Sequence, residues 1–427
     1  MPCKKIRIFL QGFCFFSFFA EKENAMRTPF LLLTLLALLA GCDPLGNGIE
    51  GDRPRNDCGP HGPGQGGTPG RQDPPAVPAR PDTSILFSAV RYPDDYDWQR
   101  DTAYGSVPFE LLLFRDFEPV LTLASGPDAC FVPDPDRHHL LSGHLYTERM
   151  ADGMTRVGRD GQELFRFNGR EYLVGLLEDG DDLYTLSRPA RGRGWSYRKN
   201  GEILLNRTDG APYGDLSDPS YGPTGALYRD DGQICFCYIA GAAPNWSFCL
   251  ARDGMETRMD NVLPSAGVLD MKLRGGRAYI LKNTFLKNVM SEGRIWPEGS
   301  GYAVTGRFSD GTGGYFSGYL DAGSWTTQHR ICGEEAVLYR SAAGTFAVHA
   351  GKDGIVRWYG PEGGGQADLP CLFPTPACAV FPDGRPLIAL SPRDSRRRPF
   401  ILDGSRLREV DVHGCISSLA VEINLPN

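Results

Sequence analysis

Apolar and polar residues alternate in short runs along most of the chain after residue 83, and turn residues separate the runs. The clearest example holds four runs, at residues 173–177, 183–188, 195–198 and 202–206. Asp-Gly and Asn-Gly turns of the kind found here favour tight β-hairpins. A close copy follows at residues 225–259, where Ile234 leads to Trp246 over the interval that separates Leu183 from Trp195. No stretch keeps a helical period, so the pattern predicts an all-β fold.

The runs repeat as units of four strands. Another unit is predicted from the runs at residues 129–132, 140–149, 154–159 and 164–167, and two late units cover residues 336–369 and 378–410. The glycines of the last turn in each unit are Gly161, Gly201, Gly254, Gly323, Gly363 and Gly404. Most of these steps are about forty residues, the spacing of four-stranded propeller blades. We therefore predict a β-propeller of seven blades, or of eight if the long interval between Gly254 and Gly323 holds an extra blade.

The two ends of the repeat region predict how the propeller closes. The first unit has runs at residues 85–91, 109–114 and 120–124 and lacks an innermost strand, whereas residues 416–423 form a run without a unit. Placing that last strand in the first blade would remove two exposed sheet edges. An open β-solenoid or two sandwiches are the alternatives.

Composition agrees with many short strands and excludes one class of partner. The chain has 53 Gly and 33 Pro, and its net charge is −7. Arg396-Arg397-Arg398 is a lone basic triplet, so nothing indicates nucleic-acid binding.

The N-terminal region carries a targeting signal. Arg27 precedes an apolar run at residues 30–40, and Leu39-Ala40-Gly41-Cys42 follows. The run is short for a membrane span, so it reads as a secretory signal, and residues 1–25 read as an over-extended start before Met26. The tetrad resembles the lipobox of bacterial lipoproteins, which implies cleavage before Cys42 and lipid attachment to it. We expect a leader at residues 1–41, a lipidated Gly/Pro-rich tether at residues 42–82 and a propeller domain at residues 83–427.

Taken together, the lipobox, the repeat period and the turn pattern resemble uncharacterised β-propeller lipoproteins of Bacteroidota. The resemblance implies a propeller fold and a lipid anchor in the cell envelope, at the outer membrane or cell surface. It carries over no catalytic residue.

One side of the predicted propeller has longer loops than the other. The tight-turn side carries the turns between first and second and between third and fourth strands, and the loop side carries the remaining connections. Long loops on a rigid scaffold are often functional. The loops at residues 92–108 and 207–224 are rich in aromatic rings and carboxylates, which suit a sugar or a peptide. The candidate ligand-binding residues are Tyr96, Trp98, Tyr104, Tyr213, Tyr221, Asp215 and Asp218.

Other chemistry finds less support. The sequence shows no nucleophile elbow, phosphate-binding loop or zinc-ligand spacing, so we expect no cofactor and no metal. Because a secreted protein can form disulfides, two are predicted, namely Cys371 with Cys378 across a Pro-containing loop and Cys237 with Cys249 across a hairpin.

These observations favour a monomeric, membrane-anchored binding module that recognises a glycan or a protein ligand. Two alternatives stay open. The first is a propeller enzyme acting on polysaccharide, a glycosidase or lyase, since paired carboxylates are defined by their separation in space. The second is a protein-interaction scaffold of the envelope.

Overall fold

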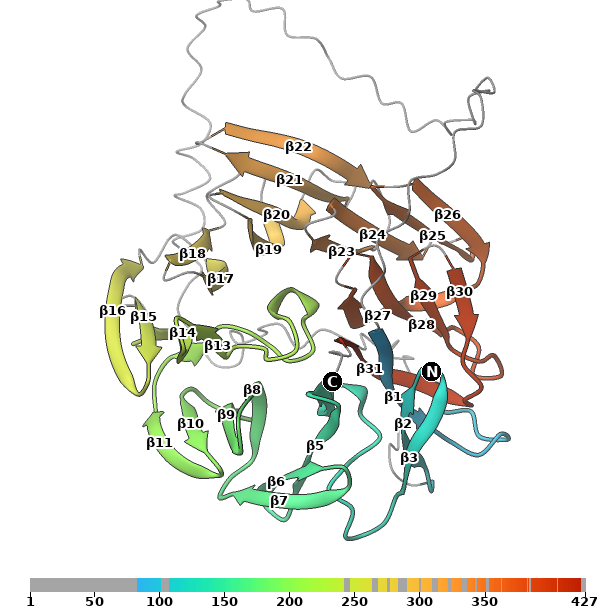
Figure 1. Cartoon of the computed structure of the whole chain (residues 1–427), viewed down its shortest axis with the longest axis horizontal. Coiled ribbons are helices and arrows are strands. Elements are labelled where there is room, and N and C mark those ends of the chain that lie inside the picture. Colours follow the sequence, from blue (N-terminus) through green and yellow to red (C-terminus); the bar gives the residue numbers. More distant parts are fainter. Residues whose placement is uncertain are drawn as a thin grey trace, which may run out of the picture. The chain divides into compact units, whose positions relative to one another are not determined.

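The computed structural model describes residues 83–423, apart from residues 101–106, 242–245, 263–267, 275–276, 283–289, 299–300, 309–313, 322–323, 332–335, 342–343, 351–352, 362, 382, 384 and 405. The described residues form β-strands, two short 3₁₀ turns and no α-helix (Figure 1). This part of the chain therefore holds no helix that is long and apolar enough to cross a membrane. The all-β prediction is confirmed. The leader, the tether, Cys42 and Tyr104 lie outside the described residues.

The strands of the first half form four antiparallel sheets, which we number in chain order. Sheet 1 combines β31 (Gly414–Ile423) with β1 (Thr83–Arg91), β2 (Glu110–Arg115) and β3 (Glu118–Ala124). Sheet 2 holds β4 (His138–Leu141), β5 (His144–Ala151), β6 (Met154–Arg159) and β7 (Gln162–Phe167). Sheet 3 holds β8 (Glu171–Asp179), β9 (Asp182–Pro189), β10 (Trp195–Lys199) and β11 (Glu202–Arg207). Sheet 4 holds β14 (Gln233–Ala240), β15 (Trp246–Arg252) and β16 (Met255–Val262), with β12 (Ala211–Pro212) and β13 (Tyr228–Asp230) paired to β14.

The second half forms four more antiparallel sheets. Sheet 5 has two strands, β17 (Val268–Arg274) and β18 (Arg277–Lys282). Sheet 6 holds β19 (Met290–Glu298), β20 (Gly301–Phe308), β21 (Tyr315–Asp321) and β22 (Ser324–Ile331). Sheet 7 holds β23 (Ala336–Ser341), β24 (Gly344–Ala350), β25 (Ile355–Gly360) and β26 (Gly363–Asp368). Sheet 8 holds β27 (Cys371–Val380), β28 (Pro386–Pro392), β29 (Phe400–Asp403) and β30 (Arg406–Glu409). The described residues thus form eight sheets, and the two-stranded sheet 5 falls in the long interval between Gly254 and Gly323.

The predicted strands match closely in sheets 3 and 7, and the last two strands of sheet 2 match as well. Residues 129–132 form no strand, and the run at residues 140–149 is split between β4 and β5. Ser142 and Gly143 make the split, because both have the positive φ angles of a tight hairpin turn (49° and 80°). The prediction is therefore wrong for the first two strands of sheet 2, where it took this turn as part of one strand.

Apolar side chains pack between neighbouring sheets, so most strands are buried on both faces. Trp195, for example, is 1% exposed and lies edge-on to Phe236 and Tyr238 of sheet 4. Buried residues of neighbouring sheets belong to common apolar clusters, for example Leu111 with Leu145, Tyr146 with Leu176, Phe248 with Met271, Leu281 with Ile295, Val348 with Ile388 and Leu387 with Phe87. The rings of Trp296 and Tyr339 meet edge-on.

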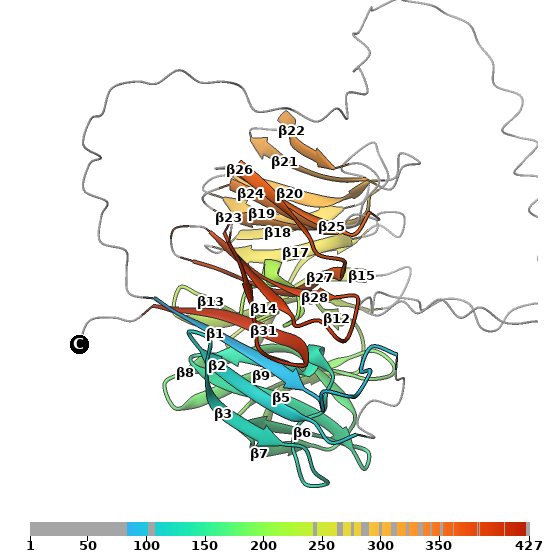
Figure 2. The same ribbon diagram turned by 90° about the vertical axis from the view of Figure 1, so that its right-hand side faces the viewer.

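The C-terminal strand β31 is the neighbour of β1 in sheet 1, and the two run antiparallel side by side (Figure 2). Their register begins with Thr83 opposite Ile423 and ends with Arg91 opposite Gly414. The Ser88 hydroxyl lies 2.7 Å from that of Ser417 in the middle of the pair. Residues from the two ends of the described chain thus share one sheet.

A polar clamp recurs in sheets 1 to 4 at the turn before the outermost strand. The first turn residue is Asp or Asn with φ between 45° and 51°. Its N–H donates to the carbonyl of a residue at the start of the second strand, and its Oδ1 accepts the N–H of that same residue. The pairs are Asp116 with Ile85, Asp160 with Leu145, Asn200 with Leu183 and Asp253 with Ile234. The Asp/Asn-Gly repeat seen in the sequence therefore joins two hairpins of each sheet as well as forming a turn.

The predicted Cys237–Cys249 disulfide is wrong. In the β14–β15 pair Tyr238 is opposite Cys249, and Cys237 is opposite Leu250. Because successive side chains point to opposite faces of a strand, this register puts the two thiols on different faces. Cys237 packs toward sheet 5 and Cys249 toward sheet 3, and both are free thiols.

The predicted Cys371–Cys378 disulfide is also wrong. Both residues belong to β27, where Cys371 pairs with Pro392 and Cys378 with Ile388 of β28. The four-residue offset along β28 spans about 13 Å, roughly twice the Cα separation of a disulfide. The stretch read as a loop is extended strand, and Cys378 is a free thiol.

Candidate functional site

Residues 211–224, which connect sheet 3 to sheet 4 and which we call the crossing segment, reach well beyond those two sheets (Figure 1). The segment begins with β12 on β14, and Gly225 just after it bridges Gly175 of β8. Between these points η2 (Pro219–Tyr221) lies against β19, β23 and β27, the first strands of sheets 6, 7 and 8. The sequence predicted only a loop between two blades. The structure makes it a link among five sheets.

Glycine is required where the segment returns to sheet 3. Gly225 has φ of 58°, and a Cβ there would lie 2.4 Å from the carbonyl oxygen of Val174. A larger residue would push the chain away from β8, where Ala226 donates its N–H to that same carbonyl at 2.7 Å.

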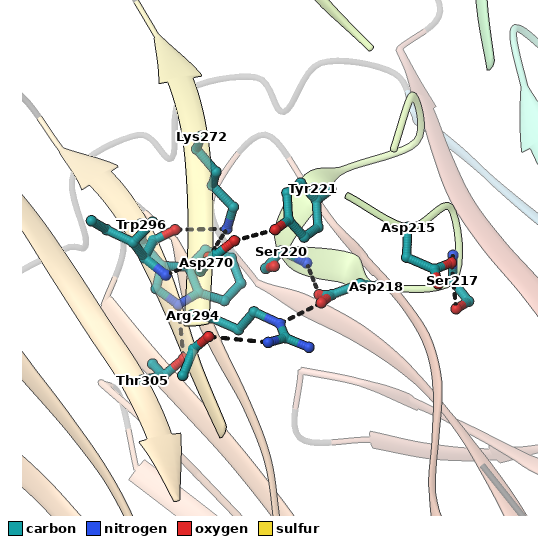
Figure 3. A network of polar contacts seen from close by, with 12 residues as sticks. Asp215, Ser217, Asp218, Ser220, Tyr221, Asp270, Lys272, Arg294, Trp296 and Thr305 are labelled. Carbon is teal, nitrogen blue, oxygen red and sulfur yellow. Dashed lines mark hydrogen bonds and ion pairs between the residues drawn. The ribbon is translucent and has the colours of Figure 1, made fainter. Parts of the chain in front are cut away.

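Tyr221 anchors the crossing segment to sheet 5 through a buried carboxylate (Figure 3). The Tyr221 hydroxyl donates to Oδ1 of Asp270, a fully buried residue of β17. The other oxygen, Oδ2, accepts the N–H of Ile295 at 2.7 Å. Burial, followed by the charge of Asp270, raises the pKa of Tyr221 well above its ordinary value, so the phenol stays protonated and keeps donating.

Lys272 completes this buried network. Its ammonium donates to the Ile295 carbonyl at 2.6 Å and lies 3.4 Å from Oδ2 of Asp270. It also sits 4.7 Å from the ring centroid of Tyr221 and 4.8 Å from that of Trp296. Burial lowers the pKa of Lys272, while Asp270 and Asp218 act in the opposite direction. A buried cation between two rings and a carboxylate is well compensated.

Asp218 makes the second anchor of the segment. Its carboxylate pairs with the guanidinium of Arg294 on β19 and accepts the N–H of Ser220 at 2.9 Å (Figure 3). Burial alone would raise the pKa of Asp218, but Arg294 and Lys272 outweigh it and hold the pKa below its ordinary value. Asp218 is therefore a fixed anion that ties the segment to sheet 6.

Tyr213, like Tyr221, packs its ring inside the protein. Its ring packs with Phe248 and Met271 between sheets 4 and 5, and its hydroxyl lies 3.4 Å from the Val268 carbonyl. Burial, then Asp270, raises the pKa of Tyr213. Tyr213, Tyr221 and Asp218 are thus brought together as the sequence predicts, with their polar groups engaged inside the protein.

Asp215 is the remaining candidate ligand-binding residue of the crossing segment, and its neighbours differ from those of Asp218 and Tyr221. Its Oδ1 accepts the N–H and the hydroxyl of Ser217, each at 2.9 Å, which closes a local turn. Its charge raises the pKa of Asp136, in η1 (Pro135–Arg137), and of Glu148, in β5. These three carboxyl groups, which we call the acidic group, belong to separate elements and interact through their charges.

Asp136 is the exposed member of this acidic group. Its side chain is accessible to solvent yet surrounded by protein. Burial of its surroundings, then Asp134, and to a smaller extent Asp215, raise its pKa to about 6, and Arg137 opposes them. The carboxyl group with this raised pKa is thus open to solvent.

Glu148 is the buried member, with 1% of its side chain exposed. It pairs with Arg137 at 2.5 Å and accepts the N–H of Leu173 at 2.8 Å. Arg137 also covers the ring of Tyr172 at 4.0 Å. Burial raises the pKa of Glu148 to about 7 against the opposing effect of Arg137. Glu148 holds Arg137 of η1 in place, and because it is buried it cannot contact a ligand.

The other predicted site residues lie in the loop between β1 and β2. Trp98 is parallel to Tyr92 at 6.2 Å, and both Trp98 and Tyr96 pack on the apolar cluster between sheets 1 and 2. The Tyr96 carbonyl bonds to Nε2 of His413 at 2.8 Å, and Asp97 accepts the Ser395 hydroxyl at 2.6 Å. Tyr92, Ser395 and His413 thus hold this loop.

Sequence reasoning missed Asp136, Glu148, Asp270, Lys272 and Arg294 as members of the site. No signal in the sequence marked Asp270 and Lys272, because they share one face of β17 with Arg274 and alternate with Leu269, Met271 and Leu273. This is the pattern of a strand with one solvent-exposed face, so it does not indicate buried polar residues with internal partners. Within the described ranges, no group of three or more His, Cys, Asp or Glu side chains could hold a metal ion.

Comparison with known proteins shows neither a family nor a function. No protein-family model and no curated protein matches the chain. Among solved structures it is similar to the dihydro-heme d1 dehydrogenase NirN in complex with DHE (12% identity, 81% of this chain and 77% of that chain, TM-score 0.41). It is also similar to a functionally unknown protein from Desulfotomaculum acetoxidans (8% identity, 78% and 98%, TM-score 0.37) and to TolB from Acinetobacter baumannii (12% identity, 75% and 80%, TM-score 0.31). At these identities and TM-scores the likenesses bear on neither fold nor activity.

Proposed function

We propose that this protein is a membrane-anchored binding module whose loop side recognises a glycan or a peptide. The observation that carries the proposal is that Asp136, in η1, and Asp215, in the crossing segment, belong to separate elements and interact through their charges. The segment is fixed by the Asp218–Arg294 and Tyr221–Asp270 contacts. Carboxylates that are held in place before a ligand arrives accept hydroxyl or ammonium hydrogens at little entropic cost.

The scaffold of the proposal is an eight-bladed propeller, the alternative that the sequence leaves open, with sheet 5 as a short blade. The pairing of β31 with β1 and the packing of sheet 8 on sheet 1 support a closed ring. Closure would fix the loop side as one surface, since the connections from all blades would then face the same way.

The anchor of the proposal is a lipid on Cys42 followed by a tether of residues 42–82. Its support is the Leu39-Ala40-Gly41-Cys42 tetrad after an apolar run. Cys42→Ser is expected to move the protein from the membrane fraction to the soluble fraction and to abolish incorporation of a labelled fatty acid. Unchanged fractionation of this variant would count against the anchor.

Binding is tested with the full chain on arrays of glycans and peptides, followed by titration calorimetry of the strongest ligand. Asp136→Asn and Asp215→Asn are each expected to weaken that ligand about tenfold, since each removes one charged acceptor. Asp231→Asn, an exposed carboxylate in the β13–β14 turn on the tight-turn side, is the matched control. A ligand that binds all four proteins equally would show that the acidic group is not the site.

A second candidate is a polysaccharide-cleaving enzyme, and one observation favours it. The raised pKa of Asp136 beside Asp215 resembles the environment of a general acid next to a second carboxylate. Release of new reducing ends from the bound glycan, lost in Asp136→Asn, would select this reading over binding alone.

A further inference from the structure

Four arginines gather around the β9–β10 loop of sheet 3. One comes just before β8, one lies near the end of β9, and two belong to the loop itself. Among the described residues, no ion pair joins any of the four to an acidic side chain. We call them the basic patch, namely Arg170, Arg188, Arg191 and Arg193.

Backbone pairing brings Arg170 and Arg188 to the same face of sheet 3. Tyr172 is opposite Arg188 in the β8–β9 register. Two residues further along the pair, Ala190 donates its N–H to the Arg170 carbonyl at 2.7 Å. Because side chains alternate between the two faces of a sheet, Arg170, Tyr172 and Arg188 share one face. The two arginines are diagonal neighbours there, with Cα atoms about 7–8 Å apart.

The ring of Tyr172 holds Arg188 in position. The guanidinium carbon of Arg188 lies 5.5 Å from the centroid of this ring, and that of Arg137 lies 4.0 Å from it. A guanidinium over a ring uses its flat face, so its in-plane N–H groups can still donate to an oxyanion. Arg137 pairs with Glu148, whereas Arg188 has no carboxylate partner in the described part of the chain.

The carboxylates nearest to the basic patch in the chain have other partners. Glu171 lies on the opposite face of sheet 3, where it pairs with Arg198 at 2.9 Å. Asp209 pairs with Arg207 at 2.9 Å and accepts the Gly241 N–H at 2.8 Å. Neither carboxylate therefore neutralises the basic patch.

The β9–β10 loop presents Arg191 and Arg193 to solvent, and both are exposed. The bond from Ala190 fixes the start of the loop, and at its end Gly194 donates its N–H to the Gly210 carbonyl at 3.0 Å. Gly194 has φ of 112°, and a Cβ there would lie 2.3 Å from the last carbonyl oxygen of β11. Glycine is thus required where the loop closes. The loop is held at both ends with two cations between them.

We propose that the basic patch binds an acidic saccharide, with carboxylate or sulfate groups at Arg170 and Arg188 and along the loop. Guanidinium groups match such oxyanions with paired hydrogen bonds. An extended peptide binds mainly along a strand edge, whereas these arginines project from a sheet face and a loop. A stiff saccharide also loses less conformational entropy on binding than an acidic peptide. The basic patch uses neither Asp136 nor Asp215, so either site can fail without the other.

The test titrates the full chain by calorimetry with tetragalacturonate, a sulfated maltotetraose, neutral maltotetraose and tetraglutamate. We expect both acidic saccharides to bind at least about tenfold more tightly than the neutral saccharide or the peptide. Arg170→Gln and Arg188→Gln should each weaken the acidic saccharides about tenfold, because each removes one charged donor group. Raising the salt from about 50 to about 500 mM should weaken binding to the wild type more than to either variant.

Tyr172 is tested as a positioning residue. Tyr172→Leu should weaken the acidic saccharides about threefold, whereas Tyr172→Phe keeps the ring and should bind like the wild type. Arg406→Gln, which removes another exposed arginine, on β30 of sheet 8, is the control for net charge and should also bind like the wild type. Circular dichroism and melting temperature establish that each variant is folded.

Two sets of results would contradict the proposal. Wild-type affinity in folded Arg170→Gln and Arg188→Gln, or an equal loss in Arg406→Gln, would overturn the site. Neutral maltotetraose or tetraglutamate binding as tightly as the acidic saccharides, or binding of none of the four probes, would overturn the ligand class.

Discussion

At the scale of single residues, the Asp or Asn in the last turn of a sheet has two functions. Its left-handed backbone forms the turn, and its carboxylate or amide oxygen joins that turn to the second strand. Asn200 and Asp253 make the same bonds in neighbouring sheets, which indicates that the acceptor oxygen matters more than the charge.

Asp253→Ala is therefore expected to lower the free energy of unfolding by about 1–2 kcal/mol. The variant leaves the Ile234 N–H without its side-chain acceptor and places Ala at a positive φ. Asp253→Asn keeps a side-chain acceptor for the Ile234 N–H and tolerates the positive φ, so it should stay within about 0.5 kcal/mol of the wild type. Urea denaturation measures the two variants, and equal losses would rule out the clamp.

Glu148 predicts a pH dependence of stability. Its pKa is about 7 in the folded protein and 4.5 in its unperturbed state, so the folded protein binds the proton more tightly. The resulting stabilisation is complete below pH 4.5 and is lost as the pH rises through 7.

The unfolding free energy of the wild type minus that of Glu148→Gln should thus fall by roughly 3 kcal/mol between pH 4.5 and 8. Denaturation at several pH values measures it. A difference that grows with pH would mean that the Arg137 pair outweighs burial.

At the scale of elements, the crossing segment depends on contacts with residues far away in the chain. Asp218 and Arg294 are 76 residues apart, and Tyr221 and Asp270 are 49 apart. The sequence analysis found the aromatic and acidic residues of the loop from their local pattern. It could not show that their partners lie on β17 and β19, because no local pattern carries that information. The Ser142-Gly143 turn lies inside an apolar run, and the first two strands of sheet 2 were therefore predicted as one.

Asp270→Asn is expected to destabilise the protein by about 3–5 kcal/mol, because it leaves Lys272 buried without its counter-charge. Tyr221→Phe removes one donor from the same carboxylate and should cost only about 1–2 kcal/mol. Both variants should speed limited proteolysis within residues 211–224, which reports release of the segment. Normal protease resistance in Asp270→Asn would show that the network does not hold the segment.

At the scale of the whole molecule, the repeat period and the all-β fold could be predicted from the sequence, since alternating apolar runs and Asn-Gly turns are local features of the chain. The number of sheets was less certain because sheet 5 has only two strands and leaves a weak repeat. The Cys237–Cys249 disulfide was mispredicted because a shift of one residue in register puts Cys249 on the other face of its sheet. The Cys371–Cys378 disulfide was mispredicted because both residues belong to one strand, β27.

The pairing of β1 with β31 is testable by cross-linking. Ser88 and Ser418 are directly opposite in the register, so Ser88→Cys with Ser418→Cys should form a disulfide under mild oxidation. Ser88→Cys with Val421→Cys is the control, because Val421 is opposite Ile85 and should stay reduced. Mass spectrometry identifies the linked peptides, and cross-linking in the control alone would contradict the register.

The central claim is that the acidic group beside the crossing segment binds the ligand, and Asp136 allows its most direct test. Its raised pKa of about 6 means that it is largely protonated at pH 5 and ionised at pH 8. Calorimetry of the array-selected ligand should therefore show binding several-fold tighter at pH 8 than at pH 5, with the difference absent in Asp136→Asn. Equal wild-type affinity at the two pH values, or the same pH dependence in the variant, would contradict the claim.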